Sequence, residues 1–568
     1  MASWLRGHVF AIAFAGAAAA AWCLLLYMGR GLTFWSDEWA FIDQRSLGSI
    51  DSLMLPHNEH WSTLAIIAYR GLFGIVGLRT YVPYLGLLLA LHLLVATAVY
   101  RLVLGSSGPW IALGGGVLIL FLGSGFENLL WAFQIGFVGA DAAGLWALVL
   151  VTGTPGRRQY LAAALLLTAG LATAGVALVF LFFVGVELAL DSRRRSGLVY
   201  LALPLGVYIT WFLIWGRLGV DTYGRPFTVE ALVRLPAFVA SGLATSLGAA
   251  TGLPGSASLG LLVLAVIIGA WRILQGRSVP ARAVGALAAL IAEYVLIGLV
   301  RGQLGDWAAV YPRYTYEAAI VVLVGVAAWI GRPALPSAPR PRSMVVIAGG
   351  LLFELLLIVN LMWLPAGRSL FLDRAGVTRG LVTVALEYGN APGVDPNRSL
   401  TLIPSPDRVR QLVSTYGDPR RDALVEGSVP AVTSSEMDRA LAELADPSLV
   451  RITAPPSFDG TPPPVISVAG AAIGNAPACD AIDARAGGAT VDLGVDAAAY
   501  LRGGASGIIR IGLGNALPPP ASDAVSEIVT AGQWYRMQLP NLGDGRPWQL
   551  GLWLQDVTSL DVCADGPP

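Results

Sequence analysis

Ionisable side chains adjoin apolar segments at four places in this sequence, and the first is Asp37-Glu38, which lies between Trp35 and Trp39. A carboxylate in such a position can accept the proton of a hydroxyl group or hold a divalent cation. Acids also favour helix N-termini, so the pair could simply cap a helix. We favour a chemical role for at least Asp37, because three further polar clusters follow it.

The second cluster is His57 and His60, in the same loop as the acidic pair. Their spacing lacks the i, i+4 geometry of a helical zinc site, and no third ligand is identifiable. A structural or phosphate-binding role for the two histidines is therefore favoured over a metal. A divalent cation (Mg, Mn or Ca), held jointly by Asp37 and Glu38 and by a phosphate group, stays open.

The third cluster contains Glu127 and Gln134, with Asn128 and Trp131 between them. Polar groups in an apolar context are costly and are functional candidates by default. No arginine is adjacent, so their partners must come from elsewhere in the chain or from a substrate. The alternative is a helix cap combined with a buried hydrogen-bonded pair.

The fourth cluster contains Arg301 and Arg313, followed directly by Tyr314. Guanidinium groups recognise phosphate through two parallel hydrogen bonds, so the two arginines suit an anionic ligand. An ion pair between Arg301 and Asp306 that holds the loop is the alternative.

The composition predicts the elements that position these clusters. Hydrophobic residues form 55% of the chain, charged residues 13%, and the mean hydropathy is +0.65, which excludes a soluble globule and a disordered chain. The 37 basic and 37 acidic residues balance, so nothing indicates a nucleic-acid partner. About eleven segments are long enough to cross a bilayer: 8–28, 80–104, 108–123, 128–152, 159–172, 174–190, 198–216, 256–274, 283–300, 315–331 and 343–364. The apolar segment 231–253 could be a re-entrant helix.

Arginine placement orients this α-helical polytopic array. The loops that follow the spans at 152, 190, 274 and 331 all carry arginine, and eleven spans place them all in the cytoplasm, as the positive-inside tendency requires. The N-terminus is then cytoplasmic, and the first run is read as a retained anchor. The segment after Leu364 and all four polar clusters lie outside.

Three regions follow from these patterns: a transmembrane domain at 1–364 with an outer loop at 29–79, a helical or linker region at 365–463, and a β-rich region at 464–568. Helical patterns occur at 373–389, 405–416 and 434–445. Strand patterns occur at Val465–Val468, Gly507–Ile511, Trp534–Leu539 and Trp548–Leu554. An extracytoplasmic α+β domain that ends in a β-sandwich is expected, where Cys479 and Cys563 could pair and Trp534, Trp548 and Trp553 could stack on sugars or form the core.

With these features in this order, the chain resembles the GT-C class of membrane glycosyltransferases. The motifs that carry the resemblance are Asp37-Glu38, His57…His60 and Arg313-Tyr314. The resemblance implies a polyprenyl-phosphate sugar donor and a glycan or glycolipid acceptor of the cell envelope. Transfer would occur on the outer face of the plasma membrane with inversion, in a cell-wall pathway of an actinobacterium. Asp37 would act as general base with Glu38 assisting, and Arg301, Arg313 and His60 would stabilise the leaving phosphate.

The β-rich region resembles the C-terminal carbohydrate-binding domains of actinobacterial arabinofuranosyl- and mannosyltransferases. Two other functions remain open. A transporter or flippase of lipid-linked sugars would show charges near the centre of several spans, and Glu187, Glu293 and Glu354 are the main examples. A non-catalytic envelope assembly protein would use the outer domain alone.

Overall fold

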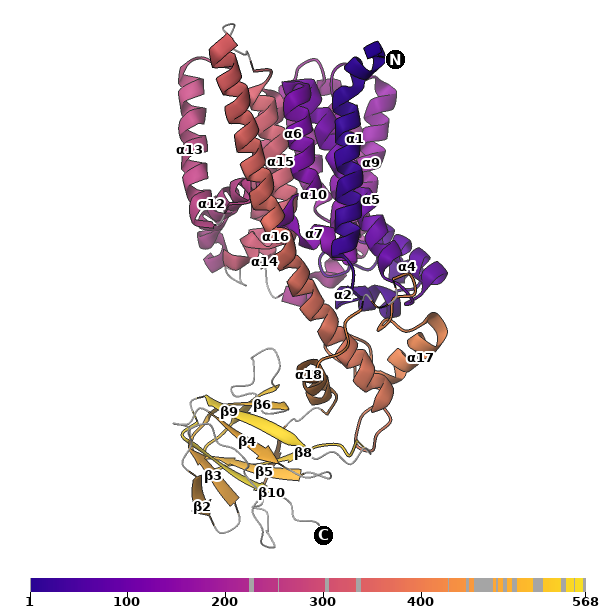
Figure 1. Ribbon diagram of the computed structural model, residues 1–568, viewed down its shortest axis with the longest axis vertical. Coiled ribbons are helices and arrows are strands. Elements are labelled where there is room, and N and C mark those ends of the chain that lie inside the picture. The colour runs from indigo at the N-terminus through magenta and orange to yellow at the C-terminus, as the bar shows by residue number, and fades with distance from the viewer. Residues whose placement is uncertain are drawn as a thin grey trace. The chain divides into compact units, whose positions relative to one another are not determined.

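The computed structural model (Figure 1) divides the chain into two compact units. The first unit comprises Met1–Arg30, Gln44–Val76 and Val82–Phe371, and the second comprises Gly31–Asp43, Gly77–Tyr81 and Leu372–Pro568. The structure describes residues 2–223, 229–253, 255–301, 306–333, 339–425, 427, 429–445, 449–453, 473–476, 479–483, 488–492, 498–513, 525–542, 548–555 and 557–564.

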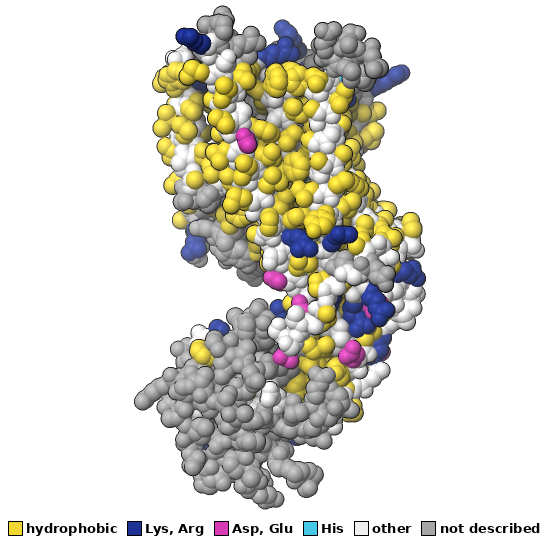
Figure 2. Space-filling model, viewed as in Figure 1, with side chains coloured by type: hydrophobic (Ala, Val, Ile, Leu, Met, Phe, Trp, Pro, Cys, Tyr) yellow, Lys and Arg dark blue, Asp and Glu magenta, His cyan; other side chains and the backbone are white. Residues whose placement is uncertain are grey.

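The first unit is an array of long apolar helices that run roughly parallel (Figure 1). Hydrophobic side chains dominate the face of this array seen in Figure 2. Nine of the described helices are long and apolar enough to cross a membrane, as expected of a multi-pass membrane protein, and three shorter apolar helices accompany them; the count of eleven spans stays a prediction. The array contains α1 (Ala2–Met28), α4 (Thr63–Val76), α5 (Val82–Ser107), α6 (Pro109–Leu120), α9 (Arg157–Leu171), α10 (Ala177–Leu190), α11 (Ala202–Ile214), α13 (Gly255–Leu274), α14 (Ala281–Arg301) and α15 (Pro312–Ile330).

The segment predicted as a re-entrant helix forms α12 (Val229–Thr251), which by length and composition could itself span a membrane. Two of its contacts lie at one end of the array. Phe238 packs against Gly298 near the end of α14, and the carbonyl of Ala249 accepts a hydrogen bond from Ser124 Oγ (2.8 Å). Gly298 and Ser124 both belong to the end of the array where Arg301 lies, but Ser246 Oγ also donates to Tyr294 Oη (3.1 Å), further inside α14, so the re-entrant helix stays a prediction.

The span predicted at 128–152 starts four residues later in the structure, where Ala132–Leu150 is long and apolar enough to cross a membrane. Two short turns, α7 (Glu127–Leu130) and the 3-10 turn η3 (Ala132–Gln134), precede α8 (Ile135–Leu150). Trp131 has extended backbone angles, so the α7 helix cannot continue through it. Irregular backbone at membrane depth is tolerated where protein buries it or where it lines a polar cavity. Glu127 therefore precedes the span, as predicted, and Gln134 lies in the 3-10 turn at its start.

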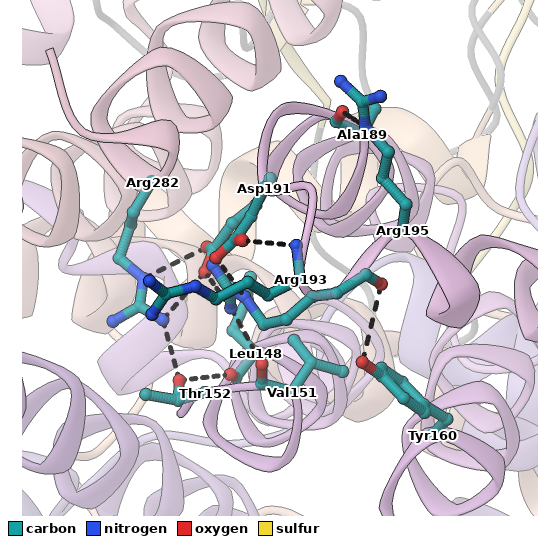
Figure 3. Close-up of polar contacts among 11 residues, drawn as sticks. Leu148, Val151, Thr152, Tyr160, Ala189, Asp191, Arg193, Arg195 and Arg282 are labelled. Atoms are coloured by element: carbon teal, nitrogen blue, oxygen red, sulfur yellow. Dashed lines mark hydrogen bonds and ion pairs between the residues drawn. The ribbon is translucent and has the colours of Figure 1, made fainter. Parts of the chain in front are cut away.

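Glu187 is buried at the opposite end of the array. Figure 3 shows the polar contacts around Thr152, Asp191 and Arg282 at this end. Glu187 Oε1 accepts hydrogen bonds from Arg194 Nη1 (2.9 Å) and Arg282 Nη2 (3.0 Å), and its Oε2 accepts one from Arg282 Nε (3.1 Å). Arg282 Nη2 also donates to Thr152 Oγ1 (2.7 Å), and Arg194 Nε donates to Asp191 Oδ2 (2.8 Å). We call these five residues the Glu187 cluster, and they tie the ends of three helices together.

The helix α16 (Pro339–Glu387) is continuous through Leu364, although the sequence predicted a span ending there and a separate helix from 373. Pro365 lies inside it and removes one backbone donor without ending the helix, as is tolerated in membrane helices. The two later helices were predicted correctly, as α17 (Pro406–Tyr416) and α18 (Ser434–Ala445). Pro406 occupies the first turn of α17, where its missing N–H is not needed.

The second unit carries two antiparallel sheets. One has the order β1-β8-β5-β10-β3-β2 and the other the order β4-β9-β6-β7. The strands predicted from 507, 534 and 548 are confirmed, whereas Val465–Val468 and the side chain of Cys479 lie outside the described residues. Cys563 is disulfide-bonded. Trp548 is buried, and its indole N–H donates to the carbonyl of Pro540 (2.9 Å). That the two sheets form a β-sandwich stays a prediction. The strands are β1 (Val450–Ile452), β2 (Ile473–Ala476), β3 (Cys479–Asp483), β4 (Gly488–Asp492), β5 (Ala498–Gly503), β6 (Gly507–Leu513), β7 (Val525–Val529), β8 (Trp534–Gln538), β9 (Gln549–Gln555) and β10 (Ser559–Ala564).

Candidate functional site

The segment from His57 to His60 is a tight turn in the first unit. The backbone N–H of each histidine donates to the carbonyl of the other, at 3.0 Å in both directions. Asn58 takes a positive φ of 52°, which asparagine adopts at lower cost than most residues. The turn places Glu59 at its tip and brings both histidines to its base.

Glu59 forms an ion pair with Arg301, the last residue of α14. Glu59 Oε1 accepts the hydrogen bond from Arg301 Nη2 and lies 3.6 Å from His60 Nε2. The Arg301 guanidinium lies over the ring of Tyr314, 5.7 Å from its centroid. Residues 59 and 301, which are far apart in the sequence, therefore meet in one ion pair at the end of the array.

A second ion pair joins Glu127 to Arg313, whose Nε donates to Glu127 Oε2 at 3.0 Å. The Arg313 guanidinium also lies over the rings of Trp131 (5.7 Å) and Tyr311 (5.0 Å). Asn128 Nδ2 donates to the carbonyl of Arg313 at 3.3 Å, which fixes the start of α15 against the irregular segment. Arg313 is therefore the partner that the sequence could not identify for Glu127.

Aromatic rings surround these ion pairs. His60 packs edge-on against Phe137 (5.2 Å between centroids), His57 packs against Phe133 (5.4 Å), and Phe137 lies 6.2 Å from Tyr314. Gly175 is required on the other side of His60, because a Cβ there would stand 2.8 Å from its Nδ1.

Several buried polar atoms at this end of the array have no hydrogen-bond partner among the residues that the structure describes. They are both amide atoms of Gln134, which is 0% exposed, together with Oδ1 of Asn128, Oε2 of Glu59 and Nε2 of His60. Such atoms cost about 1–3 kcal/mol each when nothing satisfies them. We call the residues Glu59, His60, Glu127, Asn128, Gln134, Arg301, Arg313 and Tyr314 the Arg301–Arg313 cluster.

The charges of this cluster follow from its contacts. Burial raises the pKa of Glu59, but His60 and Arg301 more than offset it, so the pKa is lowered and Glu59 is a carboxylate at neutral pH. Burial lowers the pKa of His60, and the charges of Arg301 and Arg313 lower it further against the opposite effect of Glu59. His60 is therefore a neutral imidazole beside two guanidinium groups.

The acidic pair lies in the second unit, at the start of the short helix α2 (Asp37–Trp39), which the π-helix η1 (Ala40–Gln44) follows. Glu38 is fully buried, its Oε2 accepts from the backbone N–H of Trp35 (2.7 Å), and its Oε1 accepts from Tyr81 Oη (2.8 Å). Asp37 is half-buried. Ser36, directly before it, has φ 50° and ψ −114°, a conformation that is strained for a residue with a side chain.

Seven of the residues that the sequence analysis selected belong to the first unit: His57, His60, Glu127, Gln134, Arg301, Arg313 and Tyr314. The contacts above link the histidine turn, the Glu127 segment and the two arginines at one end of the array. Glu59 was not selected as a site residue, although its position between two selected histidines could have indicated it. The predicted alternative partner of Arg301, the side chain of Asp306, lies outside the described residues.

In the part of the chain that the structure describes, no three or more His, Cys, Asp or Glu side chains form a group suited to a metal ion. Both oxygens of Glu38 already accept hydrogen bonds, so a divalent cation at the acidic pair would have Asp37 as its ligand. The cation stays a prediction.

A separate set of acids lies inside the helical array. Asp141 on α8, Glu293 on α14 and Glu317 on α15 are all buried, and they are close enough to interact electrostatically. Neither oxygen of any of the three has a hydrogen-bond partner. Sequence analysis noted only Glu293 and passed over Asp141, near the middle of the predicted span 128–152, and Glu317, near the start of the span 315–331.

No family model and no curated protein matches the chain. Among solved structures, the chain is similar to ArnT from Cupriavidus metallidurans in the apo state, with 14% identity, a TM-score of 0.43 and coverage of 70% of this chain and 82% of that one. The same protein bound to undecaprenyl phosphate matches with 14% identity, a TM-score of 0.41 and coverage of 69% and 82%. Arabinosyltransferase EmbB from Mycobacterium smegmatis matches with 12% identity, a TM-score of 0.32 and coverage of 97% of this chain and 64% of that one. These similarities are distant, so a function has to rest on the residues of the site.

Proposed function

We propose that this protein is a membrane glycosyltransferase that moves a sugar from a polyprenyl-phosphate donor to a glycan or lipid acceptor of the cell envelope. The observation that carries the proposal is the Arg301–Arg313 cluster. It combines two arginines, a neutral histidine and unpartnered amide atoms of Asn128 and Gln134 at the end of an apolar array. The guanidiniums suit a phosphate group, the amide atoms suit sugar hydroxyls, and the apolar helices suit a polyprenyl tail.

The chemistry requires one group that takes a proton and others that receive negative charge. The acceptor oxygen forms a bond to the anomeric carbon while the bond from that carbon to the donor phosphate breaks. Asp37 takes the hydroxyl proton as general base, and Glu38, held by Trp35 and Tyr81, positions its segment. Arg301 and Arg313 stabilise the charge that develops on the leaving phosphate. Direct displacement inverts the anomeric centre.

The test is a transfer assay with the purified full chain in liposomes and a radiolabelled polyprenyl-phosphate sugar. We expect Asp37→Asn to lower transfer about 10²–10⁴-fold, the range for loss of a positioned base. Asp43→Asn is the matched control, because Asp43 lies in the same unit and pairs with Arg408. A folded Asp37→Asn protein that transfers sugar at the parental rate rules out Asp37 as the base.

The proposal includes an orientation: the N-terminus in the cytoplasm of a plasma-membrane protein, and the Arg301–Arg313 cluster and the second unit outside. The Glu187 cluster is then cytoplasmic, in agreement with the arginines of its loop. Reporter fusions after residues 195 and 400 are expected on opposite sides. The same side for both contradicts the eleven-span topology.

Transport of a lipid-linked sugar is the second candidate, and the buried acids Asp141, Glu293 and Glu317 favour it. Unpaired carboxyl groups inside a membrane array are typical of proton relays in transporters. Vesicles that move labelled lipid across the bilayer without forming a glycoside, and lose that movement in Glu293→Gln, would support a transporter. Glycoside formation that survives Glu293→Gln would support the transferase.

A further inference from the structure

A cavity of about 630 Å³ lies in the second unit, and none of the residues given a role above lines it. Arg79, from the short segment Gly77–Tyr81, lines it together with Asp418, Arg420, Arg421, Asp422, Ala423, Gly427 and Val429. Its lining carries three guanidinium groups and two carboxylates. A cavity of this size fits a ligand as large as a sugar, since small-molecule sites commonly enclose about 300–1,000 Å³.

The backbone holds the two walls together. Leu78 N donates to the carbonyl of Tyr416 (2.9 Å), and Ala423 N donates to the carbonyl of Arg79 (2.9 Å). Two glycines with positive φ permit this approach: a Cβ on Gly77 would stand 2.2 Å from the Tyr416 carbonyl oxygen, and one on Gly417 would stand 2.4 Å from Arg79 Cγ. The cavity is therefore formed by close backbone contact and not by loosely placed loops.

Both carboxylates that line the cavity, those of Asp418 and Asp422, already accept hydrogen bonds from other groups of the protein. Asp418 Oδ2 accepts from Arg420 Nη2 (2.9 Å), and Arg420 Nη1 also donates to Thr383 Oγ1 (3.3 Å). Burial raises the pKa of Asp418, but the bonds and charge of Arg420, with the charge of Arg421, lower it overall, so Asp418 is ionised. Asp422 Oδ1 accepts the backbone N–H groups of Leu424 (2.9 Å) and Val425 (3.2 Å) and shapes the loop.

The guanidiniums of Arg79 and Arg421 differ from that of Arg420. Both side chains are exposed, and within the described residues no hydrogen bond or ion pair reaches either guanidinium. The cavity thus carries one arginine whose guanidinium is held by hydrogen bonds and two whose guanidiniums make none among the described residues. Each of these two guanidiniums can donate two parallel hydrogen bonds to an oxyanion, and the cavity has room for the ring that bears the oxyanion.

We propose that this cavity binds an anionic sugar, a saccharide unit bearing a phosphate or carboxylate group, with Arg79 and Arg421 on the oxyanion. Arg420, held by Asp418 and Thr383, lines the wall beside them. The site lies apart from the Arg301–Arg313 cluster in the sequence and in the division of the chain, and it requires no transfer reaction.

The test is calorimetric titration of the full chain in detergent with glucose 1-phosphate, glucuronate, glucose and inorganic phosphate. We expect glucose 1-phosphate or glucuronate to bind at least tenfold more tightly than glucose and inorganic phosphate, and the tighter of the two identifies the phosphate or the carboxylate as the oxyanion. The double variant Arg79→Gln/Arg421→Gln should lose at least tenfold in affinity for it. Arg451→Gln, the same change at an exposed position in β1, should bind as the parent does.

Two further variants separate this site from the proposed transferase. Arg313→Gln and Asp37→Asn should both retain the binding, because neither residue lines the cavity. If glucose or inorganic phosphate binds as tightly as the acidic sugars, or if the double variant binds like the parent, the proposal is wrong. Loss of binding in Arg313→Gln alone, with the double variant unaffected, also overturns it, because the ligand then occupies the Arg301–Arg313 cluster.

Discussion

The two ends of the helical array both bury glutamates against arginines, yet their contacts differ in completeness. In the Glu187 cluster, both oxygens of the glutamate accept hydrogen bonds from Arg194 and Arg282. In the Arg301–Arg313 cluster, Oε2 of Glu59 and both amide atoms of Gln134 are buried without partners. A carboxylate whose oxygens are all hydrogen-bonded needs no further partner, whereas unsatisfied buried atoms cost free energy until a ligand completes their hydrogen bonds. The comparison separates a structural ion-pair cluster from a candidate binding site.

The largest expected effect is on stability, at the complete network. Glu187→Ala leaves Arg194 and Arg282 buried without their shared carboxylate, which costs about 3–5 kcal/mol for a buried pair. Unfolding of the detergent-solubilised protein should shift accordingly. Glu354→Ala, at an exposed position on α16, is the control and should leave the transition in place. A Glu187→Ala protein as stable as the control would mean that the network does not hold the helix ends.

The next effect is on transfer, at the incomplete network. We expect Arg313→Gln to lower transfer about 10²–10³-fold, the cost of one missing donor at a developing oxyanion, with a smaller change in stability. Arg194→Gln should behave in the opposite way, with a lower unfolding temperature and unchanged transfer per folded molecule. Rates and melting curves of both variants decide the matter. If the two arginines prove interchangeable in these readouts, the distinction between the ends is lost.

A third prediction concerns the unpartnered amide. Gln134→Leu removes two buried polar atoms that nothing in the described structure satisfies, so the free energy of unfolding should rise by about 1 kcal/mol. The same substitution should raise the KM for the donor, because the amide is available to sugar hydroxyls. A substitution that stabilises the protein and leaves KM unchanged would show that Gln134 does not contact substrate.

These predictions depend on contacts of which the sequence showed only part. The apolar runs predicted most helices, because bilayer thickness fixes their length, and the spacing of turn residues predicted α17, α18 and three strands. Two signals misled. The run at 128–152 reads as a span that starts at residue 128 since Trp131 is as apolar as its neighbours, and Pro365 suggests an end that α16 does not have.

The sequence analysis identified most of the site residues from their residue types, but it did not predict which of them form ion pairs with one another. Nothing in the sequence shows that Glu59 meets Arg301 or that Glu127 meets Arg313, because each pair joins segments far apart along the chain. Glu187 shows the reverse case. Its position in an apolar run indicated a charge near the centre of a span, as expected of a transporter. In the structure Arg194 and Arg282 pair with its carboxylate, which indicates a structural role.

The smallest expected effect is a pH dependence of stability at the Arg301–Arg313 cluster. His60 is neutral when folded, with a pKa lowered by burial, so the unfolded chain binds more protons below about pH 6.5. The free energy of unfolding should therefore fall as the pH drops from 7.5 to 5.5. His60→Gln should flatten that slope relative to the parent in melting curves. An equal slope in both proteins would mean that His60 does not titrate in the way its surroundings imply.

The most direct test of the central claim is equilibrium binding of a polyprenyl phosphate to the protein in lipid nanodiscs. The account predicts that Arg313→Gln weakens binding at least about tenfold, since a hydrogen bond to a charged group contributes about 1.5–3 kcal/mol. Arg195→Gln, an exposed arginine beside the Glu187 cluster, should bind like the parent. Parental affinity in a folded Arg313→Gln protein would contradict the assignment of this end of the array to the donor phosphate.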